Sequence, residues 1–354
     1  MTTQEHIRQM AWWPTKALPA QEKYVGTAAC GKCHAGIVSS QQGSQMARTL
    51  GHAADSDVLN QHIQQSYRSG PYTYTLKQNG RDVSVVVTDG DQSRSAQLQW
   101  TFGSGEIGQS FLWRKDGAFH ENRFNYFSTM RGFAATPGRL QGAPASLDMA
   151  LGRQLTDTEA KTCFSCHSTA MTNAMPLDTS RIVPGINCEA CHGPGAEHVA
   201  AMNSRQFTGE THIVNPAKLS PVQSVDFCGA CHSSPWDVQL MGAVGVATVR
   251  FPAYRLEKSR CWGINGDARV TCIACHDPHQ PLAHQPSSYD HACLVCHLQK
   301  PHAKSGAGHP ATACPVATKD CVSCHMPKYD IPEMHYKFTD HMIRVARENA
   351  PFPE

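Results

Sequence analysis

The sequence is poor in large aliphatic and aromatic core side chains. Leu, Ile, Val and Phe together number 61 of 354 residues, about 17%. A share under roughly 20% usually indicates disorder, but only when the net charge is also high. Here the formal net charge is +2. An ordered chain of this composition needs a source of apolar mass other than its own side chains, because ordering entropy must be offset by burial.

Long hydrophobic runs and an excess of one charge are also missing. The best apolar run, from Met241 to Val249, is short and interrupted by glycine, so no membrane span is expected. The near balance of Lys+Arg 31 and Asp+Glu 29 gives no reason to expect nucleic acid or an anionic membrane as a partner. The first twenty residues lack the basic-then-apolar layout of a secretory signal.

Cysteine and histidine are abundant, with 16 and 20 residues respectively. Fourteen of the cysteines stand in seven CxxCH motifs. The motif cysteines are Cys30, Cys33, Cys163, Cys166, Cys188, Cys191, Cys228, Cys231, Cys272, Cys275, Cys293, Cys296, Cys321 and Cys324. The histidines that end the motifs are His34, His167, His192, His232, His276, His297 and His325.

CxxCH is the attachment motif of haem c. Two thiols three positions apart form thioethers with the vinyl groups on one haem edge, and the adjacent histidine becomes the proximal iron ligand. A CxxC pair alone also suits a zinc half-site or a redox pair, but neither explains a histidine after all seven pairs. The sequence therefore predicts seven haem c groups with their irons, and the macrocycles supply the missing apolar mass.

Covalent haem attachment takes place outside the cytoplasm. We therefore expect a periplasmic, extracellular or cell-surface protein whose signal peptide has been removed.

The motifs divide the chain unevenly. We expect an N-terminal tail (1–23), a first haem segment (24–65), a β-rich segment (66–150) and a six-haem cytochrome domain (151–354). Alternating apolar residues around Asn79-Gly80 predict a hairpin, and residues 66–135 read as an antiparallel β-meander. The haem-binding remainder is expected to be mostly irregular or α, with short helices and loops around cofactors and few regular elements.

Thirteen histidines remain for the second axial position, which low-spin haem usually fills with His or Met. The distal candidates in the haem-dense region are His198, His279, His341, His302, His309 and His335. For the first haem, Met46 and His52 compete, and a Met ligand would make that haem more oxidising.

Two cysteines, Cys261 and Cys314, lie outside the motifs. A disulfide between them is the favoured hypothesis, since spare cysteines in an oxidising compartment usually pair. The alternative is that one of them ligates a haem or belongs to an irregular eighth attachment site.

Several stretches resemble a known family. YVGTAACGKCH, CHGPGAEH, SRCWGINGDARVTCIACHDPH, CVSCHMPK and FTDHMIRV are similar to multihaem cytochromes of the cytochrome c-554 type. The resemblance covers about two-thirds of the chain and matches the β-rich middle weakly. It implies haem pairs in parallel-stacked and perpendicular arrangements, with distal histidines from remote loops. It also implies that His198, His279 and His341 are ligands and that Cys261 and Cys314 belong to the pattern.

Electron transfer along the haems, to and from redox partner proteins, is the first functional hypothesis. The second is a reductase or oxidase of small nitrogen or sulfur oxyanions with one open haem. The clan includes such enzymes, but CxxCK, the motif of a lysine-ligated catalytic haem, does not occur here. For this enzyme hypothesis, the candidate polar cluster beside an open haem is Arg114, Lys115, His120 and Arg123. The alternative is that these four residues form the solvated face of a strand. The third is self-association into an oligomer or conductive filament.

Overall fold

The computed structural model describes residues 23–138, 142–170, 177–204, 209–262, 269–297 and 314–354. They divide into two compact units. The β unit comprises the described residues up to Val214 together with Pro332–Tyr336. The C-terminal unit comprises Asn215–Ile331 and Lys337–Glu354.

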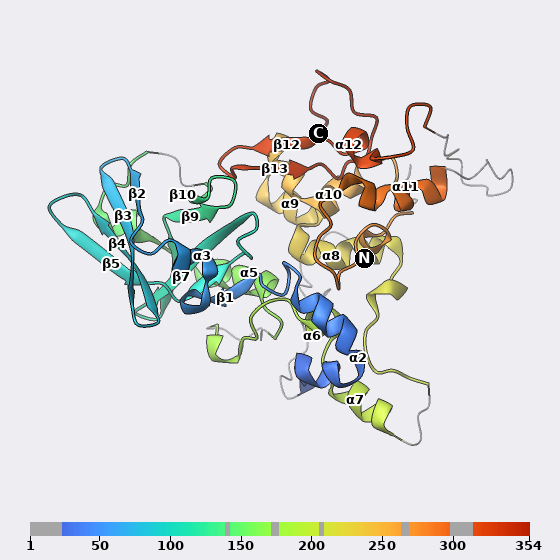
Figure 1. Cartoon of the computed structure of the whole chain (residues 1–354), viewed down its shortest axis with the longest axis horizontal. Helices are drawn as coiled ribbons and strands as arrows, with labels where there is room; N and C mark the ends of the chain where they lie inside the picture. The colour runs from blue at the N-terminus through green and yellow to red at the C-terminus, as the bar shows by residue number, and fades with distance from the viewer. Residues whose placement is uncertain (1–22, 139–141, 171–176, 205–208, 263–268, 298–313) are drawn as a thin grey trace. The chain divides into compact units, whose positions relative to one another are not determined.

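A four-stranded antiparallel sheet forms one part of the β unit (Figure 1). Its strands, in spatial order, are β2 (Ser66–Ser69), β3 (Tyr72–Asn79), β4 (Asp82–Thr88) and β5 (Ser93–Gln97). Buried residues alternate along β3 and β4, as expected for strands with one face on a core. Asn79 pairs with Asp82 across the β3–β4 turn, and Gly80 supplies the positive φ of 59° that the turn needs.

A second, seven-stranded sheet completes the β structure. Its main path runs β1 (Leu50–His52), β6 (Trp100–Phe102), β7 (Gly108–Lys115), β8 (Ala118–Asn122) and β11 (Gly152–Gln154). β9 (Phe124–Phe127) also pairs with β7, and β10 (Gly132–Ala135) pairs with β9.

The β-rich segment therefore differs from a single meander. Its strands are antiparallel and lie between Ser66 and Ala135, but they form two sheets. Strands from outside the segment, β1 and β11, pair with β6 and β8 and extend the second sheet on both sides. The backbone groups of β6 and β8 would otherwise be unpaired on one side, and β1 and β11 pair with them there.

The helices are short. In the β unit they are α2 (Thr27–Gln42), α3 (Asp57–Gln61), α4 (Leu147–Leu151), α5 (Asp157–His167), α6 (Cys188–His192) and α7 (Ala196–Asn203). In the C-terminal unit they are α8 (Pro221–His232), α9 (Pro235–Met241), α10 (Pro252–Glu257), α11 (Asp290–His297) and α12 (Cys321–His325), with a strand pair β12 (Lys328–Ile331) and β13 (Tyr336–Thr339). Short 3-10 turns include η8 (Cys272–Ala274). Capping boxes begin α5, α8 and α9.

The apolar cores of the two units differ in size. Two clusters fill the β unit, one around Tyr74, Phe111 and Phe124 between the sheets and one around Trp100 and Phe164. Within the described part of the C-terminal unit, the single cluster has four buried residues, namely Val225, Ala253, Leu256 and Trp262. So small a core agrees with the expectation that bound cofactors complete the packing of this unit.

Across the residues that the structure describes, no helix is both long enough and apolar enough to cross a membrane.

Candidate functional site

Short helices present the CxxCH motifs. α5, α6, α8, α11 and α12 each end at the motif histidine, and η8 carries the fifth motif. In a helix, residues i, i+3 and i+4 share one face, so both thiols and the imidazole point to the same side. The first motif lies within α2, and the helix breaks at His34, where φ is −114° and ψ is 38°.

The rings of His34 and His198 face one another. Their centroids are 6.4 Å apart and their planes differ by 19°. Two imidazoles that ligate one metal from opposite sides have their ring centres roughly 6 Å apart, because each metal–nitrogen bond is about 2 Å and each nitrogen lies on the edge of its ring. The separation of His34 and His198 is close to this value. His198 lies on α7, and its Nδ1 is 2.7 Å from the carbonyl oxygen of Thr211. A carbonyl only accepts, so the proton is on Nδ1 and Nε2 carries the lone pair.

His276 and His341 form a second facing pair, with centroids 6.2 Å apart and planes at 38°. The Nδ1 of His341 is 3.1 Å from the carbonyl oxygen of Thr339. Burial, and then the neighbouring His276, lower the pKa of His341 to about 4. Burial also lowers the pKa of His276. Both rings are thus neutral at pH 7, the state in which imidazole ligates a metal.

Three motif histidines are anchored through Nδ1 to backbone carbonyl oxygens. His167 lies 3.0 Å from Thr49 O, and His192 lies 2.8 Å from Val214 O. His325 lies 2.9 Å from Arg344 O. Such bonds fix the ring orientation and raise the basicity of the ligating nitrogen.

The first cysteines of different motifs are in contact. The Cys30 thiol hydrogen-bonds that of Cys188, and burial followed by this neighbour raises the pKa of Cys30 to about 11. A hydrogen bond with Cys228 lowers the pKa of Cys272. Motifs one and three are therefore adjacent in the β unit, and motifs four and five are adjacent in the C-terminal unit.

Motifs six and seven repeat the arrangement. The Cys293 thiol hydrogen-bonds that of Cys321. Burial, then Asp290, then Cys293 raise the pKa of Cys321 to about 12. This pairing of first cysteines was not foreseen from the sequence, because nothing in the local motif says which other motif lies beside it.

Buried carboxylates tie two of these motif pairs together. Glu189, inside the third motif, accepts backbone N–H groups of Val25, Gly26 and Gly195 at 2.8–2.9 Å. These groups lie just before α2, which carries the first motif, and before α7, which carries His198. Asp290, at the start of α11, accepts the N–H groups of Asp320 and Cys321 at 2.8 and 2.9 Å. Orphan amides at helix starts are satisfied by carboxylates in this way.

The other distal candidates have different surroundings. His52 packs on Trp100 with centroids 4.5 Å apart. His335 packs on Phe127 at 4.8 Å. The Nδ1 of His279 is 3.3 Å from Asp277 Oδ1.

Three further candidates have less structural context. Met46 is half-buried, and its backbone carbonyl accepts the N–H of Ile186. His302 and His309 lie outside the described residues.

Cys261 and Cys314, the expected disulfide partners, are both unbonded in the structure. Cys261 is half-buried, and burial raises its pKa; the nearby Cys296 adds to this rise, and a hydrogen bond with Ser259 opposes it. Cys314 is exposed, and its sulfur accepts N–H groups of Ala317 and Val316, which lower its pKa. The first cysteine is thus beside the sixth motif, whereas the second is held by its own turn.

Of the four polar residues proposed for an oxyanion site, Arg114, His120 and Arg123 make contacts within the sheet region. The guanidinium of Arg114 lies 5.3 Å from the Phe119 ring centroid. His120 stacks on Trp113 at 5.4 Å, and Arg123 donates to Gly142 O at 3.1 Å. Lys115 is exposed. These contacts agree with the alternative of a solvated strand face.

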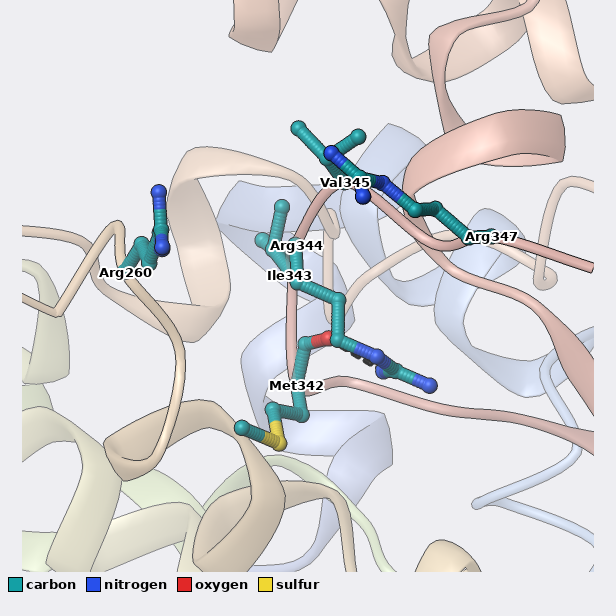
Figure 2. Close-up of a pocket in the computed structure, with 6 residues that line it drawn as sticks. All are labelled: Arg260, Met342, Ile343, Arg344, Val345 and Arg347. Carbon is teal, nitrogen blue, oxygen red and sulfur yellow. Dashed lines mark hydrogen bonds between the residues drawn. The ribbon is translucent and has the colours of Figure 1, made fainter. Parts of the chain in front are cut away.

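A cavity of about 430 Å³ lies in the C-terminal unit, where Arg260 faces the segment 342–347 (Figure 2). Its lining residues are Arg260, Met342, Ile343, Arg344, Val345 and Arg347. Two of the lining arginines, Arg260 and Arg347, suit an anionic group such as a carboxylate, whereas the guanidinium of Arg344 is bound to Asp340 and Tyr329.

Comparisons with known proteins agree with this chemistry. The family model described as cytochrome c554 and c-prime matches residues 118–193, which contain the second and third motifs. The multiheme cytochrome MtrA of Shewanella baltica (strain OS185) is 25% identical over 182 residues, 48% of this chain and 46% of that protein. The chain thus spans about half the length of this relative.

The crystal structure of the outer cell wall cytochrome OcwA has a similar fold, with a TM-score of 0.52 at 16% identity. The match covers 91% of this chain and 80% of that chain. With seven CxxCH motifs and facing histidine pairs, the chain is a multihaem c-type cytochrome that binds haem c.

Proposed function

We propose that this protein is an electron carrier with seven covalently bound haems. The observation that carries the proposal is the facing of motif histidines by remote histidines, at 6.4 Å for His34 and His198 and 6.2 Å for His276 and His341. When bound, haem c supplies one-electron redox chemistry at iron. The protein's own residues tether, ligate and space the groups.

Full axial coordination favours transfer over catalysis. In each facing pair, one imidazole comes from a CxxCH motif and the other from a distant segment, α7 or the stretch before the C-terminus. With haem bound, the two imidazoles of each pair would hold the iron from both sides, which would leave it no position for a substrate.

Neighbouring attachment points support a continuous path in the C-terminal unit. Cys228 contacts Cys272, and Cys293 contacts Cys321. Cys275, the second cysteine of the fifth motif, is close enough to Cys293 to raise its pKa after burial has done so. Motifs four to seven therefore follow one another in space as they do in sequence.

The proposed location is outside the cytoplasm, and the proposed partners are redox proteins. Support comes from the chemistry of covalent haem attachment and from the similar fold of a cytochrome of the outer cell wall.

Mass spectrometry and electron paramagnetic resonance test the proposal. The matured protein is expected to carry the mass of seven haems and an entirely low-spin ferric spectrum. His341→Ala should convert one haem to a high-spin state that added imidazole reverses. A mass with fewer haems would contradict the count. In the unmodified protein, a high-spin signal that shifts with nitrite or sulfite would favour a reductase.

A further inference from the structure

A buried charge cluster lies in the C-terminal unit. Arg255 on α10 and Asp340 after β13 are both fully buried, with exposed fractions of 0%. The Nε and Nη2 of Arg255 donate to the two carboxylate oxygens of Asp340 at 2.8 and 2.9 Å. Arg344 Nη1 donates to Asp340 Oδ2 at 2.6 Å. One carboxylate therefore receives two guanidinium groups.

The two arginines of the cluster also contact the end of the chain and strand β12. Arg255 Nη1 donates to Pro353 O at 3.0 Å, and its guanidinium lies 4.9 Å from the Phe352 ring centroid. Arg344 Nη2 donates to the Tyr329 hydroxyl at 2.7 Å. The chain end and β12 are thus held to the same charges.

The segment fixed by the cluster contains one haem ligand and contacts another. Asp340 directly precedes His341, whose ring faces His276. Four residues later, Arg344 O holds the Nδ1 of His325 at 2.9 Å, and Arg344 N donates to His325 O at 3.2 Å. A displacement of this segment would move both contacts together.

We infer that Arg255, Asp340 and Arg344 are positioning residues that set the distal ligand of the fifth-motif haem and orient the proximal imidazole of the seventh-motif haem. The inference rests on the proposed function, which assigns His276 and His341 as an axial pair. A forked, bidentate arginine fixes direction as well as distance, which a lysine cannot do.

The energetics favour positioning over bulk stability. Taking charges out of water offsets most of their mutual attraction, and buried ion pairs replaced by apolar residues are often no less stable. A cluster of three charges with one net positive charge is therefore an inefficient way to stabilise a fold. Its distinguishing property is a single, well-defined geometry for the segment from Asp340 to Arg344.

The experiment compares Arg255→Lys in the haem-loaded protein with His341→Ala as a reference. Arg255→Lys keeps the positive charge but loses the bidentate pair of hydrogen bonds to the carboxylate of Asp340. It is expected to produce the same high-spin signal as His341→Ala, in part of the molecules, with reversal by imidazole. Redox titration should also show a rise in the potential of a second haem, because His325 loses basicity when its Nδ1 bond weakens.

Arg153→Lys is the matched control. Arg153 in the β unit also binds two carboxylates, Glu121 at 3.0 Å and Glu159 at 2.7 Å. Its variant should leave spin state and titration unchanged. Tyr329→Phe removes one bond to Arg344 and serves if Arg255→Lys fails to load haem. Tyr329→Phe should shift the potential of one haem in the redox titration while all haems stay low-spin.

The outcomes separate the two claims. If His341→Ala leaves every haem low-spin, the axial assignment in the proposed function is wrong. If His341→Ala opens a haem but Arg255→Lys and Tyr329→Phe both behave like the unmodified protein, the positioning role is overturned while the ligand pair stands.

Discussion

At the scale of single residues, the assignment of His198 as a distal ligand rests on the ring that it faces. The sequence offers His198 and His279 equally, each shortly after a motif. In the structure the ring of His198 faces that of His34, and the Nδ1 of His279 lies 3.3 Å from Asp277 Oδ1, so the ligand role of His279 stays a prediction. Facing geometry depends on contacts between segments far apart in sequence, so local pattern cannot supply it.

Replacing His198 by alanine should open the first haem. The remaining imidazole, His34, would leave a five-coordinate iron, seen as a new high-spin signal by electron paramagnetic resonance and reversed by added imidazole. His284→Ala, at an exposed histidine outside the motifs and the ligand candidates, is the control and should leave the spectrum unchanged. Equal spectra for the two variants would argue against the assignment of His198.

Glu257 gives the protein a pH-dependent stability. Burial, and then the nearby Asp226, raise its pKa from 4.5 to about 7. A raised carboxyl pKa contributes stability that is complete below the unfolded value and is lost as pH rises toward about 7. The free energy of unfolding should therefore fall between pH 4.5 and 7, and Glu257→Gln should flatten this decline. Denaturant titrations at pH 5 and pH 8 measure it, with the exposed Glu197→Gln as control.

At the scale of elements, the motif helices can be predicted from the local sequence, but the elements that pack beside them cannot. The spacing of Cys188, Cys191 and His192 predicts one helical face, and α6 has that form. That Glu189 within α6 holds the start of α2 is a contact over more than 160 residues. The Asn79-Gly80 hairpin was predictable, because its turn chemistry is contained in adjacent residues.

Loss of the Glu189 carboxylate should weaken the α2–α6 contact. Glu189→Ala leaves three backbone N–H groups without their acceptor, at a cost of roughly 3 kcal/mol in the free energy of unfolding. Urea titration followed by the Soret band measures it. Glu197→Gln removes an exposed ion pair with Lys23 and should change stability by less than about 1 kcal/mol. A similar small effect for both variants would contradict the role of Glu189.

At the scale of the whole molecule, the two units differ in how much of their apolar core is made of their own side chains. The β unit has two apolar clusters made of its own side chains, whereas the described part of the C-terminal unit has one cluster of four residues. The scarcity of aliphatic residues was visible in the sequence. The pairing of motifs one and three across the β-rich segment was not, since it depends on how the sheets bring residues 30 and 188 together.

Without haem attachment, the two units should behave differently. We expect the full chain, produced where haem is not attached, to keep β-strand circular dichroism and to lose residues after about 214 to protease. The matured protein under the same protease is the control. Equal resistance of both units in the unmatured chain would show that haem is dispensable for folding.

The thiol contacts between motifs impose an order on biosynthesis. Cys30 and Cys188 would meet in a chain that collapsed before maturation, and an oxidising compartment would cross-link them. A disulfide there would block two attachment sites at once. We therefore expect haem attachment at these two motifs to precede compaction of the chain. Cys30–Cys188 cross-links in chains that reach an oxidising compartment without attached haem would be the signature of that competition.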